Sequence, residues 1–135
     1  MSILIILNYI KAMKKLSLFA IIALFGITIF SSCGSEDLKL DKKVYAPGET
    51  IKVSFKASPK WEENAWIGII PSDVGHGKEA ENDSYDIAYQ YIKGAESGTF
   101  EFTAPNDPGK YDIRMNDTDD GSKGVEIASV TFEVK

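Results

Sequence analysis

Apolar and polar residues alternate along the chain from residue 38 onward, and turn residues interrupt the alternation at intervals of roughly 8 to 12 positions. Successive side chains of a β-strand point to opposite faces, so a period of two predicts strands with one buried face. No run in this part of the sequence has the periodicity of a helix. The predicted strands cover about residues 38–45, 50–57, 65–71, 85–92, 97–103, 109–116 and 124–134.

Seven short strands separated by turns that contain Pro and Gly are typical of an antiparallel β-sandwich, in which two sheets pack face to face. The segment 65–70 is apolar at almost every position, which indicates a central strand covered on both faces. The length suits a single domain. We therefore predict an all-β fold, a seven-stranded sandwich that occupies residues 38–135.

The N-terminal segment has the pattern of an export signal. Lys14 and Lys15 precede an uncharged apolar run at 16–30, which is shorter than the roughly 20 residues of a membrane-spanning helix. Phe30-Ser31-Ser32-Cys33 resembles the lipobox of bacterial lipoproteins, and it contains the only cysteine of the chain. The resemblance implies a helical signal peptide at 1–32, an acyl chain such as palmitate on Cys33, and a short tether at 33–37.

Two alternatives accompany the export signal. Translation can begin at Met13, just before the two lysines, instead of at Met1. The apolar run could also be an uncleaved anchor helix with Cys33 as a buried free thiol. The acidic Ser35-Glu36-Asp37 resembles the signals that send some lipoproteins to the outer membrane. We expect a lipid-anchored protein of the cell envelope, in the outer membrane, with exposure on the cell surface left open.

The charge of the chain limits the classes of partner that it can bind. The chain has 15 basic and 20 acidic residues, and all of the acidic ones follow Cys33. Lys11, Lys14 and Lys15 precede Cys33, so the part from Cys33 onward has 12 basic residues and a net charge of −8. Such a balance repels phosphate backbones, which excludes nucleic acid as a partner bound through charge.

One stretch resembles the strand-F region of immunoglobulin domains. The run Asp107-x-Gly109-x-Tyr111-x-Ile113 matches their D-x-G-x-Y-x-C pattern, with Ile113 in place of the second cysteine. The resemblance implies an immunoglobulin-like sandwich in which the Tyr111 hydroxyl bonds to the backbone a few residues upstream. It also implies that Val53 replaces the other cysteine and that Trp66 lies near the position of the family's core tryptophan.

A second resemblance covers the middle of the domain. Tyr-Ala-Pro-Gly-Glu-Thr-Ile-Lys-Val at 45–53, followed by Asn-Ala-Trp-Ile-Gly-Ile at 64–69, is similar to the "PGE…WIG" pattern of SKICH-type immunoglobulin-like domains. Those domains are partner-binding or accessory modules that lack catalytic residues. The matching positions are mostly core and turn residues, so the resemblance supports the fold more than any ligand.

The sequence offers little for catalysis. It has one histidine and no Gly-x-Ser-x-Gly, P-loop, GxGxxG or HExxH motif, so we expect no enzyme activity. The leading hypothesis is a non-catalytic binding or adhesion module that meets a protein or glycan partner. A carbohydrate-binding accessory lipoprotein is the first alternative, and a structural envelope protein is the second.

The connection 72–84 is the first candidate site, because a loop this long is often functional. The alternative is a solvated polar loop with a spectator histidine. We expect this loop at the end of the domain opposite the 116–121 loop, and replaceable without loss of stability. The predicted ligand-binding residues are Asp73, His76, Glu79, Glu81 and Asp83, together with Trp61 from the 57–65 loop.

The Asp-rich segment 116–121 is the second candidate. An EF-hand reading fails because the twelfth position would be Ile127, which cannot supply a carboxylate. A looser Ca²⁺ site remains open, and the alternative is a hairpin loop whose Asp, Asn and Gly residues suit a turn. No other cofactor is expected. The candidate metal ligands are Glu62, Glu63, Asp117, Asp119 and Asp120.

Three tyrosines, Tyr85, Tyr89 and Tyr91, share one face of a predicted strand. If exposed, they would form a stacking platform for sugar rings, and if buried they would belong to the core. We expect the tyrosines to be core residues and Trp61 to be the exposed aromatic.

Overall fold

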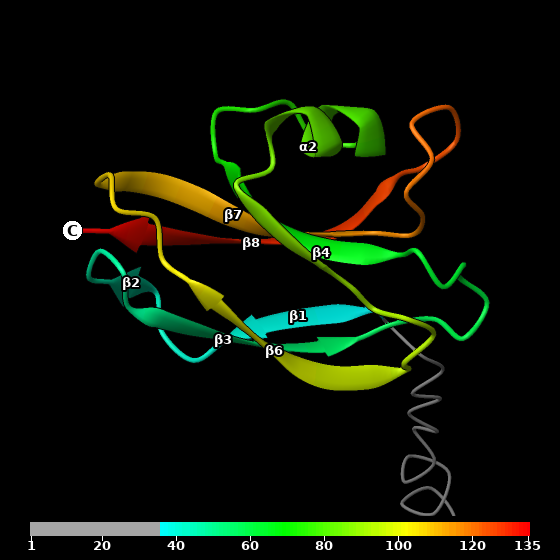
Figure 1. Ribbon diagram of the computed structural model, residues 1–135, viewed down its shortest axis with the longest axis horizontal. Coiled ribbons are helices and arrows are strands. Elements are labelled where there is room, and N and C mark those ends of the chain that lie inside the picture. The colour runs from blue at the N-terminus through cyan, green and yellow to red at the C-terminus, as the bar shows by residue number, and fades with distance from the viewer. Residues whose placement is uncertain (1–35) are drawn as a thin grey trace, which may run out of the picture. The chain divides into compact units, whose positions relative to one another are not determined.

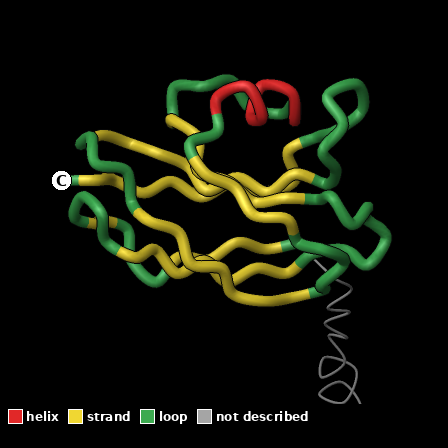
Figure 2. Tube along the Cα trace, viewed as in Figure 1, coloured by secondary structure: helices red, strands yellow, loops and turns green. Residues whose placement is uncertain are grey.

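The computed structural model describes residues 36–135, which fold into two facing β-sheets with one short helix outside them (Figures 1 and 2). The predicted signal peptide, Cys33 and most of the tether lie outside the described residues. Within 36–135 there is no helix with the length and apolar character needed to cross a membrane. The predicted all-β sandwich is confirmed.

The two sheets differ in size. The three-stranded sheet has the order β1-β3-β6 and is antiparallel. The five-stranded sheet has the order β2-β8-β7-β4-β5, and its three central strands correspond to the G–F–C order of immunoglobulin-like sheets. The strands are β1 (Asp37–Leu40), β2 (Val44–Tyr45), β3 (Thr50–Lys56), β4 (Trp66–Pro71), β5 (Ala88–Tyr91), β6 (Ser97–Thr103), β7 (Gly109–Asn116) and β8 (Glu126–Val134).

The core between the sheets follows the predicted alternation. In β3 the apolar side chains are buried and the polar ones between them are exposed. In β7 Ile113 and Met115 have no exposed surface, as the pattern predicted for that face. The Tyr45 and Phe132 rings pack edge to face, with centroids 5.6 Å apart. Full burial of each large apolar side chain contributes about 1.5–3 kcal/mol, so this core is the main source of stability.

The edges of the sheets depart from the prediction. The expected strand 38–45 is split, because the chain leaves β1 at Asp41 and joins the other sheet as β2, parallel to β8. Asp41 fixes the crossing, since its carboxylate accepts hydrogen bonds from the Tyr45 hydroxyl at 2.6 Å and the Lys52 amide at 3.1 Å. The expected strand 85–92 is shorter and pairs with β4 as an edge strand.

Two expectations from the immunoglobulin resemblance have different outcomes. The Tyr111 hydroxyl donates to the Asp107 carbonyl at 2.8 Å, so the predicted tyrosine corner is confirmed. Trp66 is buried, but it is not part of the core between the sheets. In β4 the residues that enter this core are Ile67 and Ile69, and Trp66 faces the opposite side because neighbouring strand residues point to opposite faces.

A helix, α2 (Glu79–Tyr85), occupies the C-terminal part of the segment that we expected to be a long loop. It lies against the outer face of the five-stranded sheet, near β4 (Figure 1). Glu79 and Glu81 in its first turn suit the positive end of the helix dipole. Seven residues make only two turns, which is too short to produce a recognisable helical period in the sequence.

Candidate functional site

Arg114 holds the segment 72–87 on the sheet. Its side chain has no exposed surface, although the alternation predicted only that it faces away from the core. The guanidinium donates to the carbonyls of Val74 at 2.9 Å and Gly75 at 2.8 Å, and to the Asp112 carboxylate at 2.7 Å. The two carbonyls belong to the connection, so the sheet and the connection are joined through one buried cation.

The Arg114 network extends across the covered face. Asn82 of α2 accepts from Arg114 at 2.8 Å and donates to Asn116 at 2.8 Å and to Glu126 at 3.1 Å. His76 lies at the edge of the network, with Nδ1 2.7 Å from Glu126. Asn82 thus bonds to three residues of the sheet, which holds α2 in one position on it.

Asp112 is the counter-charge in this network. Its second oxygen accepts from the Ser72 hydroxyl at 2.9 Å and the Thr131 hydroxyl at 2.7 Å. Burial alone would raise the pKa of this carboxyl, but the Thr131, Arg114 and Ser72 bonds outweigh burial and hold the pKa below its ordinary value. Asp112 is therefore a charged, structural residue.

The connection 72–87 and the loop 117–125 meet on the outer face, which contradicts the expectation that they lie at opposite ends. The Glu79 amide donates to the Gly124 carbonyl at 3.1 Å, and the Glu126 amide donates to the Gly77 carbonyl at 3.2 Å. A side chain at Gly124 would clash, because its Cβ would lie 2.6 Å from the Glu79 Cβ. The connection is thus part of the packed structure, so its replacement by a short linker should cost stability, contrary to the expectation from the sequence.

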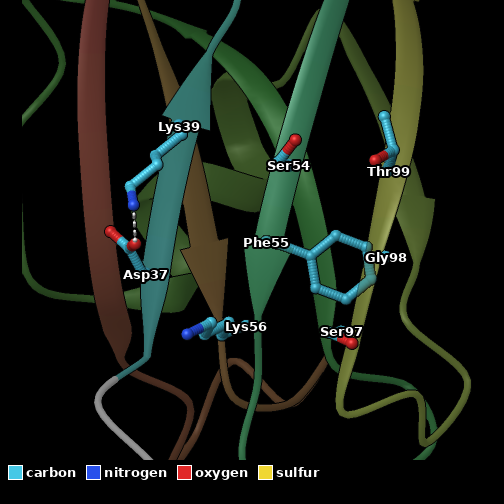
Figure 3. A pocket seen from close by; sticks show the side chains of 8 residues that line it. All are labelled: Asp37, Lys39, Ser54, Phe55, Lys56, Ser97, Gly98 and Thr99. Atoms are coloured by element: carbon cyan, nitrogen blue, oxygen red, sulfur yellow. Dashed lines mark ion pairs between the residues drawn. The ribbon is translucent and has the colours of Figure 1, made fainter.

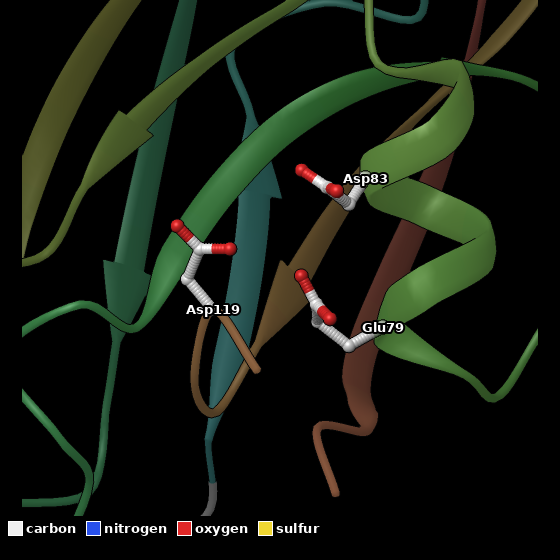
Figure 4. Close-up of side chains that lie close together, drawn as sticks. All are labelled: Glu79, Asp83 and Asp119. Atoms are coloured by element: carbon white, nitrogen blue, oxygen red, sulfur yellow. The ribbon is translucent and has the colours of Figure 1, made fainter. Parts of the chain in front are cut away.

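Three carboxylates gather where these two segments meet. Glu79 and Asp83 extend from α2 towards Asp119 of the 117–125 loop, and carboxylate oxygens of the three lie within 4.8 Å of one another (Figure 4). Glu79 is only 1% exposed and accepts a hydrogen bond from the Trp66 indole at 3.1 Å. Burial raises the pKa of Glu79, and the negative charges of Asp83 and Asp119 raise it further.

The negative field extends beyond these three residues. Burial raises the pKa of Asp86, and the charges of Asp83 and Asp119 add to the effect. Glu79 and Asp83 were predicted as ligand-binding residues and Asp119 as a metal ligand, and the structure brings them together. Asp86 was missed, because nothing in the sequence distinguishes it from other acidic residues that follow a helix.

Two of the three tyrosines, Tyr89 and Tyr91, lie beside these carboxylates. Tyr85 is 56% exposed and Tyr89 is 51% exposed, so the expectation that they are core residues is wrong. The Tyr89 ring packs edge to face against Trp66 and Tyr91, with centroids 6.0 and 5.3 Å away. The Tyr91 hydroxyl donates to Asp119 at 2.5 Å, which links the rings to the acidic group.

We call this surface the tyrosine–carboxylate face. Its exposed neighbour Ile87 adds a further apolar side chain. Tyr89 and Tyr91 also line a hollow of about 530 Å³ along the edge strand β5. The tyrosine–carboxylate face consists of Tyr89, Tyr91, Asp83, Asp86 and Asp119.

The other residues of the Asp-rich loop have local structural roles. Asp117 accepts from the Val125 amide at 2.9 Å, and Asp120 accepts from the Ser122 amide at 2.9 Å. Both bonds are those of a turn, as the hairpin alternative predicted. Asp117 and Asp120 therefore use carboxylate oxygens within their own loop, which leaves Asp119 as the loop residue directed towards α2.

Glu62 lies beside the Asp-rich loop. It accepts from Thr118 at 2.9 Å and pairs with Lys123 at 2.7 Å. Glu63 is exposed, and only its backbone carbonyl is engaged, by the Lys93 amide at 3.1 Å. The structure does not bring Glu62 or Glu63 into the carboxylate group of Glu79, Asp83 and Asp119.

Three further predicted ligand-binding residues lie outside the tyrosine–carboxylate face. Asp73 and Glu81 are exposed side chains on the 72–87 segment. Trp61 is partly buried and packs against the core, so it is not the exposed aromatic that we expected. Sequence patterns could not separate Trp61 from the tyrosines, since each has an apolar ring and a polar tip.

A second hollow, of about 360 Å³, lies on the three-stranded sheet (Figure 3). Its aromatic residue, Phe55, belongs to the core and is 4% exposed. The Lys39 ammonium at its rim is paired with Asp37 at 3.2 Å. This hollow therefore lacks the exposed aromatic rings of the tyrosine–carboxylate face.

Comparisons with known proteins add no identification. No family model matches the chain, and no curated protein matches its sequence.

Proposed function

We propose that this chain is a lipid-anchored protein of the cell envelope whose β-sandwich is a non-catalytic carbohydrate-binding module. The ligand is bound on the tyrosine–carboxylate face. The anchoring part of the proposal rests on the lipobox resemblance at Cys33. The binding part rests on the exposed tyrosine rings beside carboxylates, and the following observations support it.

The exposure and fixed position of the Tyr89 ring carry the proposal. Half of this side chain is accessible, yet the ring is held between Trp66 and Tyr91. An aromatic ring that is already immobilised loses little conformational entropy when a ligand stacks on it. The C–H groups of a sugar ring can pack on such a surface, and the neighbouring Asp119 offers an acceptor for hydroxyl groups.

The burial of Glu79 favours binding over hydrolysis. Glycoside hydrolysis needs two carboxyl groups that flank the scissile bond, one of them a proton donor with a raised pKa. Burial gives Glu79 a raised pKa, but with 1% of its surface exposed it cannot reach a bound glycosidic oxygen. The exposed carboxylates of Asp83 and Asp119 can accept hydrogen bonds from a sugar.

A small ligand fits this surface better than a large protein partner. A stable protein interface buries about 800 Å² on each partner. The exposed aromatic surface of the face comes from Tyr89 and the partly exposed Tyr91, which suits a ligand of a few sugar rings. The proposal thus selects the carbohydrate alternative from the hypotheses that the sequence left open.

A glycan array probed with the full chain in detergent tests this function, followed by calorimetry on the best ligand. Tyr89→Ala should weaken binding by about 3- to 10-fold, as expected for the loss of one aromatic contact, while Tyr89→Phe should bind normally. Val44→Ala is the matched control, because Val44 is 46% exposed and lies on β2, away from the tyrosine–carboxylate face. An array without any bound glycan, or unchanged binding by Tyr89→Ala, would contradict the proposal.

A further inference from the structure

The tyrosine–carboxylate face is acidic and lacks counter-charges. None of the ion pairs formed within residues 36–135 includes Glu79, Asp83, Asp86 or Asp119. This differs from the adjacent network, where Asp112 and Glu126 both lie within 4.0 Å of Arg114. The same outer face therefore contains a compensated acidic group and an uncompensated one.

Of the lysines next to the face, Lys123 is paired, whereas Lys93 and Lys78, which directly precedes Glu79, form no ion pair within residues 36–135. Lys123 of the Asp-rich loop pairs with Glu62 at 2.7 Å and with Asp120 at 3.7 Å. Lys93 lines the hollow beside Tyr91, at the end of β5 that leads away from α2. A positive charge that approaches Asp83 and Asp119 thus meets no competing ammonium from Lys123.

The exposed rings decide which kind of cation fits. A metal ion prefers several oxygen ligands, but one oxygen of Asp119 already accepts from the Tyr91 hydroxyl at 2.5 Å. An organic ammonium can use both features, since it donates to carboxylates and its neighbouring C–H groups lie against an aromatic face. Tyr89 supplies such a face, because its exposed ring contacts Tyr91, whose hydroxyl bonds to Asp119.

We infer that the carbohydrate bound on the tyrosine–carboxylate face carries a free amine, as in an amino sugar whose nitrogen is not acetylated. The inference rests on the proposed function, and it specifies in addition that the bound carbohydrate is positively charged. The ammonium group pairs with Asp83 and Asp119, while the sugar ring stacks on Tyr89. Burial raises the pKa values of Glu79 and Asp86, and the negative charges of their neighbours Asp83 and Asp119 raise them further.

Calorimetry with three matched oligosaccharides tests the inference. The full chain in detergent is titrated at pH 6 with a glucosamine pentamer, an N-acetylglucosamine pentamer and a β-1,4-linked glucose pentamer. The glucosamine pentamer should bind about tenfold more tightly than the other two, and its advantage should shrink in high salt. Asp83→Asn/Asp119→Asn should abolish this advantage, while binding of the glucose pentamer stays unchanged.

A charge-matched control separates local pairing from the overall negative charge. Asp107→Asn/Glu133→Gln removes the same charge near the opposite end of β7 and β8, where Gly109 pairs with Val134. This variant should keep the preference for glucosamine. Loss of the preference in both double variants would overturn the inference, because net charge alone would then explain it.

The remaining outcomes separate the inference from the proposed function. Equal affinity for all three sugars would overturn the inference that the ligand carries a free amine, but it would leave the proposal of carbohydrate binding intact. Failure of every sugar to bind would overturn both. Tight binding of an oligolysine peptide with no sugar binding would also overturn both, and it would make the partner a basic polypeptide.

Discussion

Replacement of Arg114 by methionine should destabilise the domain strongly. Methionine keeps much of the volume but removes the bonds to Asp112, Asn82 and the carbonyls of the connection. The Asp112 carboxylate would remain 1% exposed without its cation. Breaking a buried pair by removing one partner costs about 3–5 kcal/mol, and we expect Arg114→Met to fall in this range.

Urea titration of Arg114→Met, Asp112→Asn and the double variant measures this cost. It also shows how much of the cost comes from the uncompensated charge of Asp112. The double variant should lose less than the sum of the single variants, because without the carboxylate there is no buried charge to leave uncompensated. Arg114→Lys is the control that keeps the charge but loses the planar, five-donor geometry, so it should lie between the wild type and Arg114→Met.

Trp66 reports on the same change locally. It is 2% exposed beneath α2, so release of the helix should shift its fluorescence towards that of a hydrated indole. A cost below about 1 kcal/mol for Arg114→Met, with unchanged Trp66 emission, would refute the conclusion that Arg114 anchors the 72–87 segment.

Four other outcomes are expected. Ile113→Ala should cost about 2–5 kcal/mol in urea titration and Tyr111→Phe about 1 kcal/mol, whereas a near-neutral Ile113→Ala would place the wrong face of β7 in the core. Burial raises the pKa of Glu79 above 4.5, so unfolding free energy should fall as pH rises through that raised value. Glu79→Gln should flatten this slope, and an unchanged slope would exclude Glu79 as its source. The pKa of Asp112 is held below 3.8, so its contribution to the free energy of unfolding should be lost only as pH falls below about that value. Asp112→Asn should remove this loss of stability at low pH. Cys33→Ser should leave the precursor uncleaved and without acyl chains, and mass spectrometry that finds an unmodified Cys33 in the mature wild type would contradict anchoring.

The alternation of residues was sufficient to predict the sandwich because one face of most strands packs into a single core. Ile113 and Met115 illustrate this, since both are buried on the predicted face of β7. The Tyr111 corner was also predictable, because it depends on a local run of sequence. Pairing partners at the sheet edges, such as β2 with β8, depend on contacts distant in sequence and were not predictable.

The candidate site was harder to predict for a physical reason. A period of two shows that Asp112 and Arg114 face away from the core, but not that another segment covers them. The covering helix α2 is too short to leave a periodic signal. The exposure of Tyr89 depends on where that helix ends, so it could be learned only from the structure.

The most direct test of the tyrosine–carboxylate face as a binding surface is an amide chemical-shift titration of the full chain with the glucosamine pentamer. Binding at this surface predicts saturable shifts concentrated at residues 83–91 and around Asp119, with little change in the three-stranded sheet. Saturable shifts centred instead on β1, β3 and β6, or no shifts at ligand concentrations in the millimolar range, would contradict it.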